Sequence, residues 1–175
     1  MNSDNDIIFE GEYPNGKGKE YFKNKKIKFE GYYINGIKYN GKGYDKYGKI
    51  IYELKNGIGY IKELDYYGEL IYEGEYVNGK RHGKGEEYKN NEIKFVGIFL
   101  FNFKKKGKEY VNDKLEYEGE YLFNKKWNGK GYNKNGNIIY ELINGNGKVK
   151  EYYYYNLIFE GEYLNGQKYG KGKEY

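Results

Sequence analysis

The chain contains no cysteine, threonine or alanine, and Ser3 and His82 are its only serine and histidine. Without cysteine, disulfides and cysteine-ligated metals are excluded. A Ser-His-Asp or Cys-His catalytic site needs its nucleophile on a rigid element, and the body of the chain has no Ser, Thr or Cys. A phosphate-binding loop needs Gly-Lys followed by Ser or Thr, which NGKGKEY does not provide. A single histidine cannot build a His-rich metal centre. We therefore expect no enzyme, no catalytic residue, no metal site and no cofactor.

Long hydrophobic runs are also missing. No stretch reaches the roughly 18 apolar residues that a membrane-spanning helix needs. The opening residues 1–8, MNSDNDII, are acidic and lack the apolar core of a signal peptide. These absences predict a soluble cytoplasmic protein that is not secreted and has no transmembrane segment.

Tyrosine and glycine are what the chain has in abundance, with 26 and 27 residues respectively. Aromatic residues make up 21% of the sequence, which argues against disorder because disordered chains are poor in large apolar side chains. The net charge of +5 is small, since 31 basic residues are interleaved with 26 acidic ones.

One short phrase recurs along the chain. An aromatic residue, usually followed by Glu-Gly, returns at spacings of 19 to 23 residues. The repeats start at Phe9, Phe29, Tyr52, Tyr72, Phe95, Tyr117, Tyr140 and Phe159. A longer period of 88 residues relates YNGKGYDKYGKIIYEL at 39–54 to WNGKGYNKNGNIIYEL at 127–142, which indicates that a block of four repeats was duplicated. Residues 9–175 are thus expected to form one repeat array after a short polar tail, residues 1–8.

Each repeat has the pattern of a β-hairpin. Alternation in FEGEY places Phe159, Gly161 and Tyr163 on one face and the two glutamates on the other. Asn-Gly dipeptides supply the positive φ angles of tight hairpin turns. A glycine on the aromatic face lets a neighbouring ring lie flat on the backbone, so that rings can replace a second layer. The predicted fold is all-β: an elongated, single-layer, twisted antiparallel sheet of about eight stacked β-hairpins.

The only proline, Pro14, lies in the opening repeat. Because proline cannot donate a ladder hydrogen bond, we expect it to blunt the N-terminal edge of the sheet. The C-terminal edge is expected to stay open to pairing with a second copy.

The repeat resembles the MORN (membrane occupation and recognition nexus) repeat. Residues 72–88, YEGEYVNGKRHGKGEEY, carry its Tyr-Glu-Gly-Glu-aromatic opening, its Asn-Gly-Lys turn and the His-Gly-x-Gly of its second strand. The resemblance implies elongated single-layer sheets with an aromatic-lined groove. The eleventh position of the full-length repeats is then expected to line that groove; it holds Tyr39, His82, Trp127 and Tyr169.

The repeat at 95–103, FVGIFLFNF, departs most from the pattern. Val96 and Ile98 replace the glutamates of the solvent face, so this strand is expected to be hydrophobic on both sides. The candidate interface comprises Phe95, Val96, Ile98, Phe99, Phe101 and Phe103. Contiguous exposed apolar surface usually marks an interface, either with a partner or with a second copy in a dimer. The alternative is a degenerate repeat that a stable array tolerates.

Three binding functions remain open. The first is a non-enzymatic scaffold whose aromatic-lined groove accepts a partner protein. The second is peripheral attachment to anionic membranes or phosphoinositides through clustered lysines. The candidate lipid contacts are Lys23, Lys25, Lys26, Lys28, Lys104, Lys105, Lys106 and Lys108. The third and most remote is single-stranded nucleic acid, which a single Arg and a small net charge disfavour. Because Glu alternates with Lys almost everywhere, we rank the scaffold above the lipid hypothesis.

Overall fold

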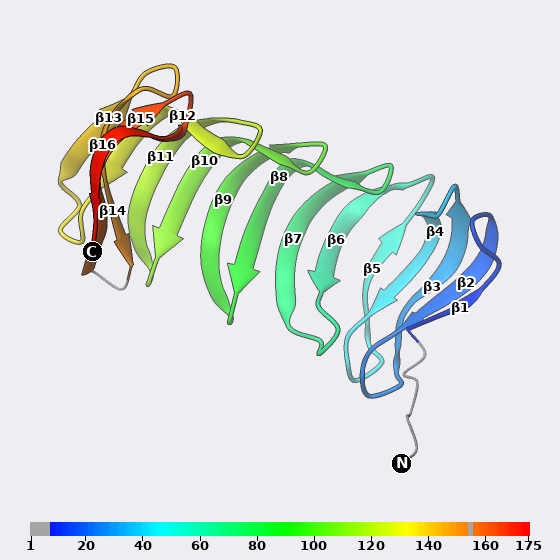
Figure 1. Ribbon diagram of the computed structural model, residues 1–175. Helices are drawn as coiled ribbons and strands as arrows, with labels where there is room; N and C mark the ends of the chain where they lie inside the picture. The colour runs from blue at the N-terminus through cyan, green and yellow to red at the C-terminus, as the bar shows by residue number, and fades with distance from the viewer. Residues whose placement is uncertain (1–7, 154–155) are drawn as a thin grey trace, which may run out of the picture. The chain divides into compact units, whose positions relative to one another are not determined.

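The computed structural model describes residues 8–153 and 156–175, and these residues form strands joined by turns and loops, with no helix (Figure 1). Sixteen strands follow one another along the chain. They are β1 Phe9–Gly11, β2 Gly16–Tyr21, β3 Ile27–Ile34, β4 Ile37–Tyr44, β5 Ile50–Leu54, β6 Ile58–Leu64, β7 Leu70–Val77, β8 Lys80–Lys89, β9 Glu92–Leu100, β10 Phe103–Val111, β11 Lys114–Leu122, β12 Lys125–Tyr132, β13 Ile138–Leu142, β14 Gly147–Tyr153, β15 Asn156–Leu164 and β16 Gln167–Glu174. The prediction of an all-β chain of consecutive hairpins is confirmed.

The strands form three antiparallel sheets, β1–β5, β6–β13 and β14–β16, each ordered as in the sequence. Each of the short repeats at 52 and 140 has a single isolated β-bridge after its first strand. The bridge joins Lys55 to Ile58 after β5, and Ile143 to Asn146 after β13. The predicted continuous ladder therefore breaks at the short repeats, where a single bridge replaces a paired hairpin. The chain folds as two compact units, residues 1–91 (the N-terminal unit) and 92–175 (the C-terminal unit).

Glycines face one another across neighbouring strands. Gly31 pairs with Gly41, Gly74 with Gly85, and Gly119 with Gly129. In these repeats the opening ring lies over the glycine pair: a Cβ built on Gly129 would lie 2.6 Å from the Tyr117 hydroxyl oxygen. In the short repeats the opening ring lies against a single glycine, Tyr52 against Gly43 and Tyr140 against Gly131. Because the glycines have no side chain, the rings pack directly on the backbone, as the sequence predicted.

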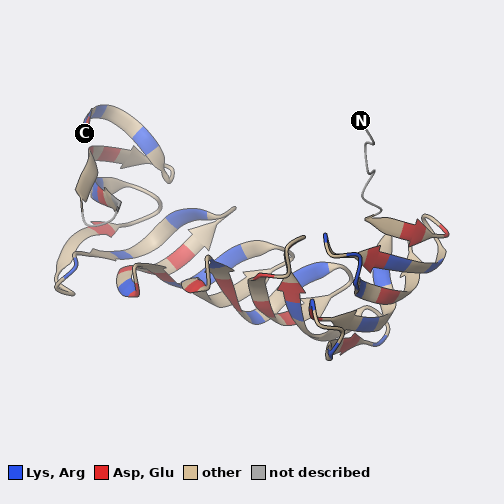
Figure 2. Cartoon of the chain, turned by 90° about the horizontal axis from the view of Figure 1, so that it is seen from below, with Lys and Arg blue, Asp and Glu red and all other residues tan. Residues whose placement is uncertain are grey.

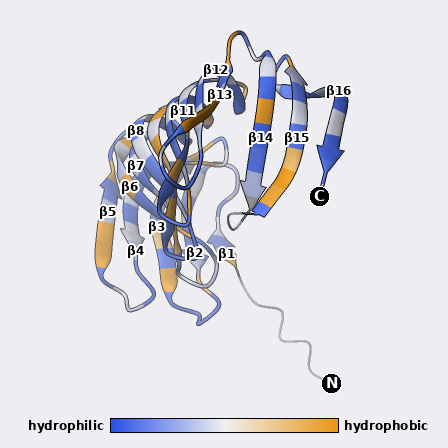
Figure 3. Cartoon of the chain, turned by 90° about the vertical axis from the view of Figure 1, so that its left-hand side faces the viewer, coloured by the Kyte–Doolittle hydropathy of each residue, from blue (hydrophilic) through white to orange (hydrophobic). Residues whose placement is uncertain are grey.

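This ring-bearing side of each sheet, the aromatic face, holds the core. Phe29, Tyr72, Phe95 and Tyr117 are fully buried, and Tyr140 and Phe159 are nearly so. In the C-terminal unit, a hydrophobic stretch lies in the middle of β14 and another near the start of β15, whereas β16 is mostly hydrophilic (Figure 3). β16 is also exposed along its length. The core therefore consists mainly of aromatic rings, together with buried aliphatic side chains at Leu54, Ile61, Leu64, Leu142 and Val149.

The opposite side of each sheet, the charged face, carries direct cross-strand ion pairs. Lys19 pairs with Glu30 at 3.3 Å, Lys62 with Glu73 at 3.1 Å, and Lys150 with Glu160 at 3.0 Å. Figure 2 shows the resulting alternation of blue and red bands along the strands. These side chains are partly solvated, so each pair is worth about 0.2–1 kcal/mol. On this face, therefore, glutamates pair with lysines across neighbouring strands.

The turns within the repeats use left-handed backbone at two successive residues. The first of these is Asn, followed by Gly, at Asn35, Asn56, Asn78, Asn144 and Asn165, with φ between 48° and 52°. Two of these turns are also bonded to a strand of the preceding hairpin: the amide of Asn56 donates to Oδ1 of Asn40 in β4 at 2.7 Å, and that of Asn144 to Oδ1 of Asn128 in β12 at 2.7 Å. The asparagines therefore both shape the turns and tie successive hairpins together.

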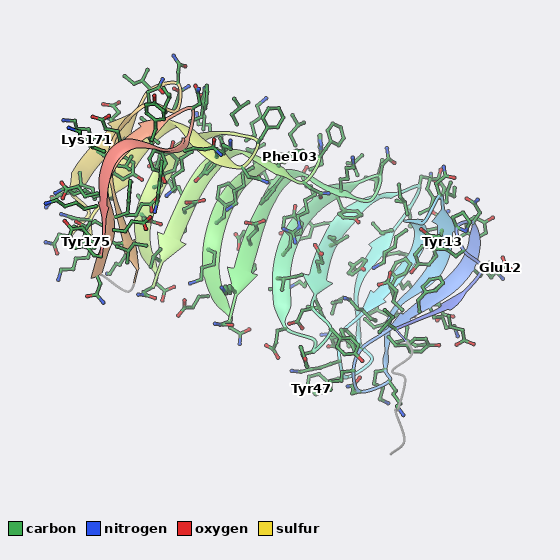
Figure 4. All side chains as sticks on the ribbon, viewed as in Figure 1. Glu12, Tyr13, Tyr47, Phe103, Lys171 and Tyr175 are labelled. Atoms are coloured by element: carbon green, nitrogen blue, oxygen red, sulfur yellow. The ribbon has the colours of Figure 1, made fainter. Side chains whose placement is uncertain are left out.

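Several loops between repeats are closed by a side-chain cap. Oδ1 of Asp45 accepts the amides of Tyr47 and Lys49, both at 2.9 Å, and Oδ1 of Asn133 accepts those of Asn135 and Asn137, both at 3.0 Å. In the first loop this leaves the Tyr47 ring exposed (Figure 4). The backbone hydrogen bond from Lys49 helps to hold the pKa of Asp45 below its ordinary value.

Pro14 lies in the bend between β1 and β2, outside both strands, and its carbonyl accepts the amide of Gly36 at 2.8 Å. The prediction that Pro14 blunts the edge strand is wrong in its mechanism, because Pro14 is not in the edge ladder. The edge strand β1 is instead short, at 3 residues.

Candidate interaction surface

A row of cations covers the aromatic face. In each full-length repeat and in the divergent repeat at 95, the residue nine positions after the opening aromatic is Lys or Arg. These residues, named here the cation row, are Lys38, Arg81, Lys104, Lys126 and Lys168. Each holds its charge over the opening ring of its own repeat, at 4.1 to 5.0 Å from the ring centroid. The arrangement is a repeated cation–π contact on a half-buried surface.

Carboxylates flank the cation row. Lys38 lies 2.7 Å from Glu20, and Arg81 lies 3.0 Å from Glu63 and 2.8 Å from Glu87. In the C-terminal unit, Lys168 lies 3.4 Å from Glu151 and 3.1 Å from Glu174. The cations of this face are therefore paired with carboxylates of the same face. We infer that these charges stabilise the fold and are not primarily available to a ligand.

Glu109 is the most heavily paired of these carboxylates. It lies 3.3 Å from Lys104 and 3.1 Å from Lys126, and its side chain is about four-fifths buried. Burial alone would raise the pKa of Glu109, but the two lysines outweigh burial and leave it below its ordinary value. For Lys126, burial alone would lower the pKa, and the attraction of Glu109 leaves it raised. The attraction between Glu109 and Lys126 therefore keeps both side chains charged in spite of burial.

The four predicted groove residues do not form a common groove lining. Tyr39 and Trp127 are half-buried at β-bulges, and their carbonyls accept the amides of Gly57 and Gly145 from the next turn. A Cβ built on Gly145 would lie 2.7 Å from the Trp127 ring, so this ring covers that turn. His82 is half-buried on β8, and Tyr169 is 62% exposed on β16. Tyr39 and Trp127 hold successive hairpins together.

The predicted lipid-binding lysines are divided between different surroundings. Lys23, Lys25 and Lys26 are exposed in the loop between β2 and β3, whereas Lys28 is half-buried and burial lowers its pKa. Lys104 belongs to the cation row. Lys105 and Lys106 are exposed, and Lys108 pairs with Glu118 at 3.6 Å on the charged face. Neither cluster therefore presents all of its charges to a single surface.

The predicted interface residues likewise separate. Phe95 and Phe99 are buried in the aromatic face, with ring centroids 5.2 Å apart. Phe101 lies in the β9–β10 turn at φ 50°, and Phe103 lies on the next strand, β10. The prediction that residues 95–103 form one strand is wrong, because β9 ends at Leu100 and the chain reverses at Phe101-Asn102.

Val96 and Ile98 do lie on the charged face, opposite Lys108 and Lys106 of β10. Replacing both with glutamate would supply the carboxylates that pair with lysine elsewhere on this face. We expect the double variant to be at least as stable as the wild type, within about 1 kcal/mol, by urea denaturation. A loss of more than 2 kcal/mol would show that the two apolar side chains have a packing role of their own.

A different apolar surface appears at the turns of the C-terminal unit. It consists of exposed side chains from the β9–β10 and β11–β12 turns and is named here the turn-edge cluster: Leu100, Phe101, Phe103, Leu122 and Phe123. The rings of Phe103 and Phe123 meet edge to face, with centroids 5.8 Å apart. The amide of Lys104 donates to Oδ1 of Asn124 at 2.7 Å and ties the two turns together. Figure 4 labels Phe103 at this edge of the sheet.

The two turns of this cluster hold phenylalanine where other turns hold asparagine. Phe101 and Phe123 have φ of 50° and 49°, and they are 46% and 70% exposed. A bulky residue in left-handed backbone costs about 1–3 kcal/mol, and an exposed ring recovers little of that by burial. The sequence offered a signal for this feature, since Phe101-Asn102 stands in FLFNF where Asn78-Gly79 stands in YVNGK.

The part of the chain that the structure describes contains no helix of the length and apolarity needed to cross a membrane. Within residues 8–153 and 156–175, no group of three or more His, Cys, Asp or Glu side chains is placed to hold a metal ion.

Comparison with known proteins adds no relative. No protein-family model matches the chain, and no curated protein matches it. The candidate site therefore stands on the geometry of this chain alone.

Proposed function

We propose that the protein is a non-enzymatic interaction scaffold of the MORN-repeat type, and that the turn-edge cluster is its protein-binding surface. The supporting observation is that Phe101 and Phe123 are exposed in a backbone conformation that disfavours phenylalanine. Backbone strain of this kind persists where the surrounding structure holds it, and it gathers at ligand-binding sites. The MORN assignment is supported by the repeat length, the hairpins and the Asn-Gly turns.

The cluster has the composition of an interface centre. Aromatic side chains at such centres provide most of the binding free energy, and charged residues lie around them. Here three phenylalanines are bordered by the exposed lysines Lys105 and Lys125. We infer a partner segment that carries apolar side chains and one or more carboxylates.

Exchanging the two turn phenylalanines for asparagine tests the proposal. The variant Phe101→Asn with Phe123→Asn creates Asn-Asn turns like Asn90-Asn91, which has φ of 54° and 62°. Relief of strain should raise the free energy of unfolding by about 1 kcal/mol per turn, measured by urea denaturation. Binding of the partner should be lost, because the anchoring rings are gone.

The partner is found by photo-crosslinking from position 123, followed by mass spectrometry. The double variant should no longer bind the crosslinked protein in purified form. Tyr47→Asn, which removes an even more exposed ring in the N-terminal unit, should bind it normally. Analytical ultracentrifugation tests whether the partner is a second copy. Undiminished binding by the double variant would refute the proposal.

Peripheral attachment to anionic membranes is the second candidate function. It is supported by apolar rings beside Lys105 and Lys125, an arrangement that suits a negatively charged lipid surface. Flotation with vesicles that contain phosphoinositide, compared with neutral vesicles, separates the two candidates. Flotation that is lost in the Phe101→Asn, Phe123→Asn variant would favour the membrane over the protein partner.

A further inference from the structure

Among the positions at which the two halves of the duplication differ is a phenylalanine that is buried in the first half. In both, the strand motif KGKEY, at 17–21 and 106–110, is followed by a loop and the next opening aromatic. The residue directly after the motif is Phe22 in the first half and Val111 in the second. Phe22 is only 2% exposed, so its ring fills the space beneath its loop.

In the C-terminal unit, a pocket of about 210 Å³ lies where Val111 replaces the larger side chain. Its apolar walls come from Val111, Leu115, Tyr132 and Tyr152. It opens between the β10–β11 turn and the β12–β13 loop that Asn133 caps, with the exposed Lys134 at its mouth. An apolar cavity of about 150 Å³ is sufficient to bind benzene in a protein core, so this pocket has room for a substituted ring.

One carboxylate lines the pocket. Glu116 stands where the first half has Lys28, directly before the opening aromatic. Its nearest cation, Nζ of Lys126, lies 3.8 Å away and is held more closely by Glu109, at 3.1 Å. Glu116 is half-buried, and burial raises its pKa above the ordinary value. It is therefore an acidic hydrogen-bonding group in a pocket that the polar residues Lys114, Asn133, Lys134 and Asn135 also line.

The fold pairs phenol hydroxyls with carboxylates at several places. The hydroxyl of Tyr21 donates to Glu10 at 2.8 Å, and that of Tyr33 donates to Glu20 at 3.1 Å. The hydroxyl of Tyr163 donates to Glu151. We propose that the pocket binds a phenol ring, which fills the space that Phe22 fills in the first half and donates its hydroxyl to Glu116.

The phenol could be a free small molecule or the tyrosine side chain of a peptide. The probe for the shared chemistry is p-cresol, with toluene as the matched ring without a hydroxyl. Titration of the full chain, followed by the methyl NMR signals of Val111 and Leu115, should give saturable shifts. We expect p-cresol to bind about tenfold more tightly than toluene.

Two variants test the geometry. Val111→Phe should fill the pocket and weaken p-cresol binding at least tenfold, whereas Ile143→Phe, at an exposed turn position, should leave it unchanged. Glu116→Ala should reduce p-cresol to the affinity of toluene without weakening toluene. Far-UV circular dichroism checks that each variant is folded; if Val111→Phe is not, the Glu116→Ala comparison decides.

N-acetyltyrosinamide distinguishes the two possible sources of the phenol, a free small molecule and a tyrosine side chain. Binding of this probe at the same methyl groups would assign the pocket to a tyrosine side chain, and binding of p-cresol alone would assign it to a small phenol. The proposal is overturned if the pocket methyls do not shift with any probe. It is equally overturned if folded Val111→Phe binds p-cresol as the wild type does, or if Glu116→Ala keeps the preference over toluene.

Discussion

Replacing Gly119 with valine is expected to lower the free energy of unfolding by about 3 kcal/mol or more, measured by urea denaturation. A Cβ at this position would lie 2.2 Å from the carbonyl oxygen of Asn128 and 2.7 Å from both the Cα of Gly129 and the Tyr117 hydroxyl oxygen. Two of these atoms are backbone of the paired strand, so the ladder itself would have to separate.

The matched control is Lys130→Ala, on the charged face of the same strand pair, where Lys130 is paired with Glu118. Its cost should stay below about 1 kcal/mol, because the side chain is exposed. Equal costs for the two variants would show that the rings do not need bare backbone beneath them.

Replacing Glu109 with glutamine is expected to cost about 3–5 kcal/mol at neutral pH, since it leaves two half-buried lysines without their shared carboxylate. Glu118→Gln is the control: its carboxylate pairs with Lys108 at 3.6 Å on the charged face and is nearly half exposed. That change should cost less than about 1 kcal/mol. A cost for Glu109→Gln no larger than the control would mean that the cation row does not stabilise the sheet.

The effect of Glu109 should depend on pH in one direction. Its pKa is lower in the folded state than the ordinary value of 4.5, so the unfolded state binds the proton more tightly. The stabilisation is therefore complete above the unfolded pKa and is lost as the pH falls through the folded pKa. The difference in unfolding free energy between wild type and Glu109→Gln should shrink steadily below about pH 4.5.

The hairpins and the ring-on-glycine packing could be predicted from the sequence because both follow local rules. Asn-Gly specifies a tight turn, and the two-residue period assigns Phe159 and Gly161 to one face. The cation row could not be derived from that period, since bulges interrupt it. Tyr39 is the extra residue between Lys38 and Asn40, which are paired with Tyr33 and Tyr32. The constant spacing of nine residues between each opening aromatic and the following cation is present in the sequence. Whether that cation lies over the ring depends on the position of the bulge, which the sequence does not show.

The turn-edge cluster was missed for a related reason. Counting alternate residues through FLFNF treats Phe101 as part of a strand, whereas its left-handed backbone reverses the chain. Alignment with the neighbouring repeats would have placed the turn correctly. The pocket beside Val111 was beyond such reasoning, because only the packing of Phe22 shows that the corresponding position faces inward.

The hydrogen bonds from turn amides to side chains of the preceding hairpin have a mechanical consequence. When a run of consecutive antiparallel hairpins is pulled from its two ends, the backbone hydrogen bonds between strands bear the force one after another. Each hairpin would therefore separate from the sheet on its own. The bond from Asn56 to Asn40 spans two hairpins, as does that from Asn144 to Asn128. A hairpin held in this way cannot open at its turn without also releasing its neighbour's side chain. These asparagines would therefore raise the force that is needed to separate one hairpin from the next.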